Sequence, residues 1–480
     1  MKLKTMLTIS ALALYSVANA QLPMAERFTG NVTSKSVVTT DNIFNYSTSE
    51  VTFEPGARTK WHAHDEGQIL ICTAGEGWYQ EQGKEARHLH AGDVVKIPPR
   101  VIHWHGAAAN NLFTHLSQIP HQKDGKTQWH GAVEQVDYAA LPHDKTIVKP
   151  IELIGQGSFM AGGKVLSIPG TYSHSNFRNP SGQTAHVDQA YTFYQYPINA
   201  KETPLVMLHG GGQSGKTWET TPDGREGFQN IFLRKGYPVY IVDQPRRGRA
   251  GSAADTVTVA PRYFDNALFC LFRIGDENGK PFAGSQFPTD STSIDQLMKW
   301  GTPDTGGYDD DVTSDALTQV LNESGAKSIL VTHSRGGFPG WLTGIKSDNL
   351  KAIISLEPGG SQFVFPNTDV PDNIQTSYGE LTPYIVSLDA FKKLTRYPIV
   401  IYYGDFLATN QVEHIGMDQW RGEMEMAKKM CGVINKYGGH AEVIHLPEIG
   451  IKGNTHFLMA DKNNTVIADL IERWIHENVK

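Results

Sequence analysis

Short strand-like segments separated by turns fill the first part of the chain, from about Val37 to Pro120. Glycine and proline interrupt them at short intervals. This pattern predicts a small β-sandwich or barrel. The clearest strand candidates are Val51–Phe53, Gln68–Thr73, Gly77–Gln80, Asp93–Ile97 and Leu112–Gln118.

The pattern of apolar positions changes from about Val206 onward. Continuous apolar runs, typical of buried parallel strands, now alternate with helical segments. This alternation predicts an α/β fold built on a parallel sheet. The expected strands are Leu205–Leu208, Pro238–Asp243, Ser328–Thr332, Ala352–Leu356, Ile399–Tyr403 and Glu442–Leu446. The expected helices are Glu226–Lys235, Asp315–Asn322 with Ser314 as its cap, Gly336–Ile345, Gln419–Tyr437 and Thr465–Glu477.

The two patterns predict two domains, an all-β domain over residues 21–145 and an α/β domain over residues 146–480. We expect residues 147–197 to add antiparallel strands at the sheet edge. The aromatic-rich residues 250–313 are expected to form a cap over the site. Residues 1–20 have the order of parts of a signal peptide, which predicts a periplasmic or secreted protein. No later apolar run is long enough to span a membrane.

Composition narrows the classes of function. The 480 residues include 43 basic and 50 acidic side chains, for a net charge of −7, and no basic block occurs. Nucleic-acid binding needs clustered lysine and arginine, so it is not expected. The three cysteines do not form a disulfide scaffold. A Cys270–Cys431 bridge stays open in an oxidising compartment, and Cys72 is expected to be a buried apolar residue.

The first chemical signal is a set of histidines in the β-rich part. His62 and His64 are two residues apart, so they share one face of a strand, and His103 would come from another strand. Three neutral imidazoles with a fourth ligand suit Mn, Fe, Co, Ni, Cu or Zn. The supporting residues, in order, are Gly56, His62, His64, Gln68, Gly75, Gly92, Pro98 and His103.

These residues resemble the two motifs of the cupin family over residues 45–120, and in particular the small cupins associated with carboxymuconolactone-decarboxylase-like domains. The resemblance implies a metal site formed by His62, His64, Gln68 and His103. Gln68 stands where most cupins have glutamate, and an amide oxygen is a weaker ligand than a carboxylate. Arg100 and Ala107 also depart from the second motif. The further histidines nearby are expected in rim or core positions: His88, His90, His105 and His115.

The second chemical signal is a serine after a buried strand. The strand Ser328–Thr332 leads into His333, Ser334 and Arg335, and a helix follows. A strand, a sharp turn with serine and a helix form the context of a nucleophile elbow. Thr332 replaces the usual first glycine of that motif. The alternative is that Ser334 only caps the helix.

A glycine loop follows an earlier strand, at His209–Gly212. Loops of this type supply a backbone N–H to an oxyanion hole, and the N–H of Arg335 would be the second donor. His209 and His333 are expected to have structural roles. Residues 210–217 also match the P-loop pattern, but the turn-like residues after Thr217 argue against the helix that a P-loop needs.

The remaining triad members would follow in the order acid, histidine. His456 precedes the last helix and is the candidate base. Two acids compete. Glu357 follows one strand and Asp405 follows the next, and spacing alone does not choose between them.

The segments around Trp218, Val242, Ser355 and Gly453 resemble a family of secreted bacterial and fungal esterases with the α/β-hydrolase fold. The resemblance covers about residues 150–480. It implies Glu357 as the acid, with Asp405 as the alternative, and Gly211 and Arg335 as oxyanion donors.

The sequence therefore predicts an exported serine hydrolase that cleaves a small-molecule carboxylic ester or lactone through an acyl-enzyme at Ser334. That step needs no cofactor, while the fused cupin is expected to bind a divalent metal. Two alternatives stay open. The cupin metal could be the main catalyst, as a decarboxylase, isomerase or oxygenase, or the cupin could be a non-catalytic module for binding or for homodimer formation.

Overall fold

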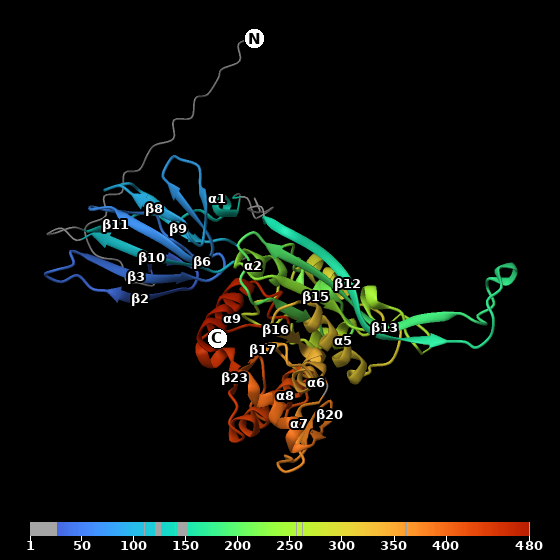
Figure 1. Ribbon diagram of the computed structural model, residues 1–480. Coiled ribbons are helices and arrows are strands. Elements are labelled where there is room, and N and C mark those ends of the chain that lie inside the picture. Colours follow the sequence, from blue (N-terminus) through green and yellow to red (C-terminus); the bar gives the residue numbers. More distant parts are fainter. Residues whose placement is uncertain are drawn as a thin grey trace, which may run out of the picture. The chain divides into compact units, whose positions relative to one another are not determined.

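The chain folds into two compact units, residues 1–143 and 144–480, shown in the computed structural model of Figure 1. The structure describes residues 26–109, 111–120, 126–139, 141, 151–255, 257–261, 263–360 and 362–479. The expected signal peptide, residues 1–20, lies outside the described residues. Because the two units are separate bodies, each is described by itself.

The first unit is a nearly closed antiparallel β-barrel, as expected. Its main path of neighbouring strands runs β1-β4-β9-β6-β10-β3-β2, and β6, the longest strand, pairs with β7, β8, β9 and β10. The strands are β1 Phe28–Thr29, β2 Val32–Val38, β3 Tyr46–Phe53, β4 Arg58–Thr59, β5 His62–His64, β6 Gln68–Glu81, β7 Arg87–His90, β8 Val94–Ile97, β9 His103–Ala107, β10 Phe113–Pro120 and β11 Thr127–Trp129, with helix α1 Gln135–Ala139.

The period of two along these strands determines what fills the barrel. In β10, Phe113, His115 and Ser117 are buried, while Thr114 and Leu116 between them are partly exposed. Side chains of a strand point alternately to its two faces, so the barrel interior receives every second residue. Phe53, Leu70, Cys72 and Leu89 are among the other buried core residues. Cys72 therefore has the buried apolar role expected for it.

The second unit is a mixed eight-stranded sheet in the order β12-β13-β15-β14-β16-β17-β22-β23. In this order the strands from β15 to β23 pair parallel with one another, whereas β12 with β13 and β13 with β15 pair antiparallel and form the expected antiparallel edge. The eight strands are β12 Leu153–Ser167, β13 Thr184–Pro197, β14 Leu205–Leu208, β15 Val239–Asp243, β16 Ser328–His333, β17 Leu350–Leu356, β22 Ile399–Tyr403 and β23 Ala441–His445. Two small sheets lie outside it, one of β18 Val364–Pro366 with β21 Tyr384–Val386 and one of β19 Ile374–Thr376 with β20 Gly379–Leu381. Figure 1 shows the β12–β13 hairpin reaching out from its unit.

Helices cover both faces of this sheet, which explains why its strands are apolar at every position. Val206 and Leu330 pack in a core cluster with residues of α5, α6 and α8. Met207 and Val331, one residue further along their strands, pack with α2 and α9 on the other face. The helices are α2 Phe228–Arg234, α3 Asp265–Leu271, α4 Ser291–Lys299, α5 Asp310–Glu323, α6 Gly337–Lys346, α7 Leu388–Lys392, α8 Ile415–Lys436 and α9 Asn464–Asn478.

Two helices, α5 and α8, begin earlier than the sequence predicts, α8 at Ile415 and not at Gln419, and the structure also answers the open question of a disulfide. The helix expected from Asp315 begins at Asp310, because Asp309 is its cap and accepts a hydrogen bond from the Val312 N–H at 3.0 Å. Ser314 lies inside the helix and donates to a backbone carbonyl instead. Cys270 and Cys431 are not bridged, and all three cysteines are buried free thiols. Within the described part of the chain, no helix combines the length and apolar character of a membrane span.

Candidate functional site

Ser334 stands at the sharp turn between β16 and α6. Its φ angle is +53°, in the left-handed region that a non-glycine residue adopts only at a cost in free energy. The backbone of Gly210 lies directly against it, since a Cβ on Gly210 would lie 2.7 Å from the Ser334 Cβ. The strained turn therefore holds the serine side chain beside the glycine loop that follows β14, as in a nucleophile elbow.

The glycine loop is fixed by its neighbours. The backbone N–H of Gly212 donates to the Tyr308 hydroxyl at 3.1 Å, and a Cβ on Gly211 would lie 3.7 Å from the Arg335 Cβ. Gly211 and Arg335, the two expected oxyanion donors, thus lie next to each other. His209 is buried and accepts a hydrogen bond from the Gln244 N–H at 3.1 Å, which gives it the structural role expected.

The P-loop pattern at residues 210–217 does not lead into an α-helix. It ends in a single 3-10 turn at Gly215–Trp218, and the next α-helix begins at Phe228. The Lys216 ammonium donates to the Thr220 carbonyl at 2.5 Å and lies 5.0 Å from the centre of the Trp300 ring. The Lys216 ammonium therefore interacts with groups of the protein itself, and it does not have the position of a phosphate-binding lysine.

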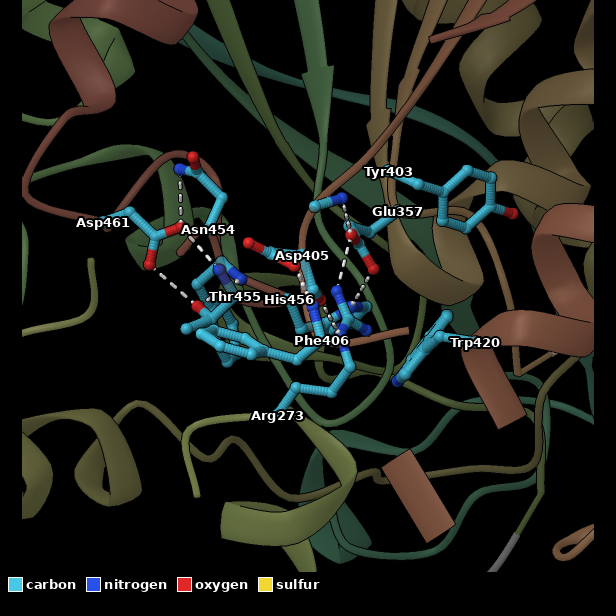
Figure 2. A network of polar contacts seen from close by, with 12 residues as sticks. Arg273, Glu357, Tyr403, Asp405, Phe406, Trp420, Asn454, Thr455, His456 and Asp461 are labelled. Carbon is cyan, nitrogen blue, oxygen red and sulfur yellow. Dashed lines mark hydrogen bonds and ion pairs between the residues drawn. The ribbon is translucent and has the colours of Figure 1, made fainter. Parts of the chain in front are cut away.

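His456 and Glu357 form a buried pair near the turn that carries Ser334. The Nδ1 atom of His456 lies 3.2 Å from Oε2 of Glu357, and both side chains have no exposure to solvent. Glu357 comes directly after β17, with a φ angle of +51°. The His456 ring is stacked between Phe272, at 5.3 Å, and Trp420, at 4.1 Å between ring centres. Figure 2 shows the pair and the Trp420 ring.

The other ring nitrogen of His456, Nε2, is buried and has no hydrogen-bond partner within the described residues. The backbone carbonyl of His456 accepts a hydrogen bond from Nε2 of His333, the residue before Ser334, at 3.0 Å. The serine strand and the histidine loop are therefore bonded to each other. The unpartnered Nε2 belongs to a loop that is bonded to the residue before Ser334, and a neutral imidazole nitrogen of this kind can accept a proton.

Arg273 is the unexpected member of the network in Figure 2. Its Nη2 donates to Oε1 of Glu357 at 2.7 Å, and its Nε donates to the Asp405 carbonyl at 2.8 Å. The Gly404 N–H also donates to Oε1 of Glu357. The Glu357 carboxylate thus receives hydrogen bonds on both oxygens although it is fully buried.

These contacts determine the charge states. Burial alone would raise the pKa of Glu357, but the Arg273 charge and the His456 hydrogen bond outweigh it, so the pKa is lowered. Burial lowers the pKa of His456 below its ordinary value of 6.5, and the hydrogen bond to Glu357 opposes this shift only in part. At neutral pH the pair therefore consists of an ionised carboxylate and a neutral imidazole.

Asp405, the alternative acid, has a different set of partners. Its Oδ2 accepts from the Gly453 N–H at 2.8 Å and its Oδ1 accepts from the Phe406 N–H at 2.7 Å. Among these contacts none is to the His456 ring. Asp405 instead ties the loop that carries His456 to the end of β22.

Asp461 holds the same loop from the other side. It accepts hydrogen bonds from the Thr455 N–H and hydroxyl, both at 2.8 Å, and from the Asn454 amide at 2.9 Å. Burial raises the pKa of Asp461 to about 7 in spite of these bonds. Sequence reasoning missed both Asp461 and Arg273, because neither belongs to a motif with a recognisable spacing.

A cavity of about 630 Å³ adjoins the glycine loop. Most of its lining is apolar and comes from the segment between β15 and α5, the region expected to form a cap. Gly211 and Gly212 lie at one side, and the larger lining side chains are Phe264, Leu268, Phe272, Leu297, Met298, Trp300, Tyr308 and Phe457. The space suits an apolar organic molecule brought against the glycine loop.

The first unit brings together the histidines expected to bind a metal. His62, His64 and His103 are buried, and one nitrogen from each lies within 4.8 Å of the others. The Nδ1 atoms of His62 and His103 each donate to a backbone carbonyl at 2.9 Å. Such bonds fix the tautomer that leaves Nε2 with its lone pair, as in protein metal sites.

Gln68 completes the cluster in a way that fits a cation. Its Oε1 lies 2.9 Å from Nε2 of His103, while its amide nitrogen donates to the Ser117 hydroxyl at 2.8 Å. Because His103 already donates its Nδ1 proton, Nε2 and Oε1 are both acceptors and cannot bond to each other. A shared cation reconciles them, since neighbouring ligands at about 2.1 Å from an octahedral metal lie about 3 Å apart. Nε2 of His64 is also buried without a partner among the described residues.

Burial keeps these imidazoles uncharged. It lowers the pKa of His64 and of His103 to about 4, and it lowers the pKa of His62 well below 6.5, with neighbouring histidines adding to the shift for His62 and His64. Neutral imidazole is the form that binds a metal. His105 and His115 are buried in the core, one of the two positions expected for them, and Nε2 of His115 lies 3.1 Å from Nδ1 of His105.

Comparison with known proteins assigns both units to families. The cupin domain family matches residues 49–113, and the alpha/beta hydrolase family matches residues 205–422. Over 21% of the chain the sequence is 46% identical to (R)-mandelonitrile lyase from Granulicella tundricola, 77% of which is covered. It is 27% identical to a fungal protein named Probable secreted lipase phiG, over 57% of this chain and 82% of that protein. A solved structure described as a novel bacterial esterase is 29% identical with a TM-score of 0.56, covering 70% of this chain and 100% of that one.

Removing Arg273 tests the buried charge network. Arg273→Leu leaves the Glu357 carboxylate buried without its cationic partner, so we expect the free energy of unfolding to fall by about 3–5 kcal/mol in urea titrations at pH 7. The double variant Arg273→Leu/Glu357→Gln removes the unpaired charge and should regain a large part of that loss. A loss below about 1 kcal/mol for Arg273→Leu would show that the ion pair does not support the fold.

Proposed function

Because the chain joins a cupin domain to a domain of the alpha/beta hydrolase family, we propose that its second unit is a serine hydrolase that cleaves carboxylic esters or lactones. The observation that carries this proposal is the buried His456–Glu357 pair, whose free Nε2 lies in the loop bonded to the Ser334 strand. The esterase and lipase named among the similar proteins support the same class of substrate.

In the proposed reaction, the Ser334 hydroxyl attacks the substrate carbonyl carbon while Nε2 of His456 takes its proton. The carbonyl oxygen becomes an oxyanion, which accepts hydrogen bonds from the backbone N–H groups of Gly211 and Arg335. The C–O bond then breaks, and His456 returns the proton to the leaving alcohol. Water attacks the acyl-enzyme in the same way and releases the acid.

Glu357 orients the His456 ring and stabilises the imidazolium that forms when the proton moves. Arg273 is a positioning residue in this scheme, because it touches Glu357 and not the substrate. It holds one carboxylate oxygen, so that the other, Oε2, faces Nδ1 of His456.

The lining of the 630 Å³ cavity favours an apolar acyl or alcohol group. We propose that residues 250–313 act as the cap that forms most of this wall and excludes water from the acyl-enzyme. We also propose that the protein is exported, from the signal-peptide pattern of residues 1–20 and its similarity to a probable secreted lipase.

A second candidate function belongs to the cupin unit, where His62, His64, Gln68 and His103 would hold a divalent metal. Such an ion would supply a Lewis acid for a hydroxyl or carbonyl oxygen. The 46% identity to (R)-mandelonitrile lyase favours a lyase activity on small hydroxynitriles. His105, whose ring centre lies 5.3 Å from that of His62, is a neutral imidazole beside this site, because burial and the neighbouring histidines lower its pKa well below 6.5.

We expect Ser334→Ala to lower kcat for short-acyl aryl esters by at least about 1,000-fold, because no other nucleophile occupies the turn. The wild type should keep its activity after treatment with a chelator, since the reaction uses no metal. Release of the coloured alcohol is the measurement. Esterase activity that survives in Ser334→Ala would overturn the proposed nucleophile.

Glu357→Gln and Asp405→Asn form a matched pair for the acid in the same assay. The first should lose most of kcat because Oε2 no longer orients an ionised partner for His456. Asp405→Asn keeps a side-chain oxygen that can accept from the Gly453 N–H and should lose much less. The reverse order would make Asp405 the acid.

The pH profile follows from the His456 pKa, which burial lowers from 6.5. The base must be neutral, so kcat/KM should stay level as pH falls through 6.5 and decline only below it. The profile should be recorded from pH 4 to 8 with an ester whose leaving group does not titrate there. A midpoint at or above 6.5 would contradict this environment for His456.

The lyase candidate is tested by benzaldehyde formation from (R)-mandelonitrile. Activity should disappear after chelation, return when Mn²⁺ is added, and be absent in His64→Ala, which removes a ligand. Ser334→Ala is the matched control and should retain full lyase activity. Formation of benzaldehyde at an unchanged rate after chelation would reject this candidate.

A further inference from the structure

A second histidine cluster lies on the cupin unit, on a different face of its strands. β7 pairs with β6 so that Glu76 stands opposite His90 and Trp78 stands opposite His88. Leu89, between the two histidines, is fully buried in the barrel core. Because side chains alternate along a strand, Glu76, His88 and His90 share the face that points away from that core.

We propose that Glu76, His88 and His90 form a second metal site, for a divalent d-block cation such as Zn²⁺. One ligand atom from each residue lies within 4.8 Å of the others. Two imidazoles and a carboxylate form a ligand set that zinc accepts, with one position left for water. The site is independent of both proposed activities, and it gives a ligating role to two histidines that were expected only in rim or core positions.

The ligands are largely positioned in advance. The His88 ring stacks on the buried Trp78 ring, with 4.5 Å between ring centres and 20° between planes. The backbone N–H of His90 donates to Oδ2 of Asp93 at 2.8 Å, which fixes the turn after β7. A tetrahedral zinc with bonds of about 2.0–2.2 Å separates its ligands by roughly 3.4 Å. Small rotations of the three side chains would therefore bring their ligand atoms from within 4.8 Å of one another to the separation that a bound zinc requires.

A simple ion pair does not explain this cluster as well. Nε2 of His88 lies 3.7 Å from Oε2 of Glu76, beyond hydrogen-bond distance. A carboxylate and two imidazoles held at this spacing can all bind one divalent cation.

The charged groups around the cluster favour a cation overall. Asp93 lies 3.8 Å from Nδ1 of His90 and adds a negative charge to that of Glu76, while Arg87 lies 3.6 Å from Asp93 and offsets part of it. All three ligand side chains are partly exposed. The site can therefore exchange metal directly with solvent, whereas the cluster of His62, His64 and His103 is buried. A cation bound here would link β7 to β6.

The test is metal stoichiometry of the full chain. Chelator-treated protein is titrated with Zn²⁺ by calorimetry, and bound zinc is measured after dialysis. His88→Gln/His90→Gln should bind one equivalent less than the wild type, whatever the buried cluster binds. The control is His476→Gln, a lone exposed histidine whose Nε2 lies 4.0 Å from Glu472, and it should bind as the wild type does. Equal stoichiometry in the double variant and the wild type would overturn the proposal.

Glu76→Gln keeps both imidazoles and tests the third ligand with little risk to the fold. It should weaken zinc binding at this site by about 10-fold or more, without changing benzaldehyde or ester assays. Circular dichroism establishes that each variant is folded before its zinc content is compared. An affinity identical to that of the wild type would remove Glu76 from the site and reject the three-ligand proposal.

Discussion

The Glu357 carboxylate is ionised although no part of it reaches solvent, and the surrounding structure of the second unit depends on satisfying that charge. Arg273 neutralises it, the Gly404 N–H and Arg273 donate to one oxygen, and His456 meets the other. A buried charge without such partners would cost several kcal/mol. The network therefore joins the ends of β17 and β22, the histidine loop and the segment after α3 into one rigid arrangement.

The cupin unit solves a different problem, that of keeping several polar rings in an apolar barrel. Each imidazole of the buried cluster has one nitrogen held by a carbonyl or hydroxyl, so that its other nitrogen is directed by the fold and not by solvent. Burial keeps the rings neutral, and neutral rings at close range repel little. The hydrogen bonds and the neutral charge that stabilise these histidines inside the barrel also leave one nitrogen of each ring able to bind a metal.

The sequence was most informative where one local pattern determines the structure. The continuous apolar runs of Leu205–Leu208 and Ile399–Tyr403 are strands with those bounds, because burial on both faces leaves no polar position. The start of α5 was misplaced since several acidic and hydroxyl residues in a row can each cap a helix. The acid was left open because Glu357 and Asp405 follow neighbouring parallel strands, which end at the same edge. Arg273 was missed because its role exists only through residues about 84 and 132 positions away in sequence.

The separate origins of the cavity wall and of the reacting groups have a consequence for how such a protein can diversify. Ser334 and Glu357 follow strands of a rigid sheet, whereas most of the wall comes from one continuous segment between β15 and α5. Selection can therefore alter, lengthen or replace that segment and change which molecule the cavity accepts, while the groups that we propose to transfer the proton are inherited intact. Substrate range and reaction type are thus encoded in different parts of the gene and can evolve at different rates.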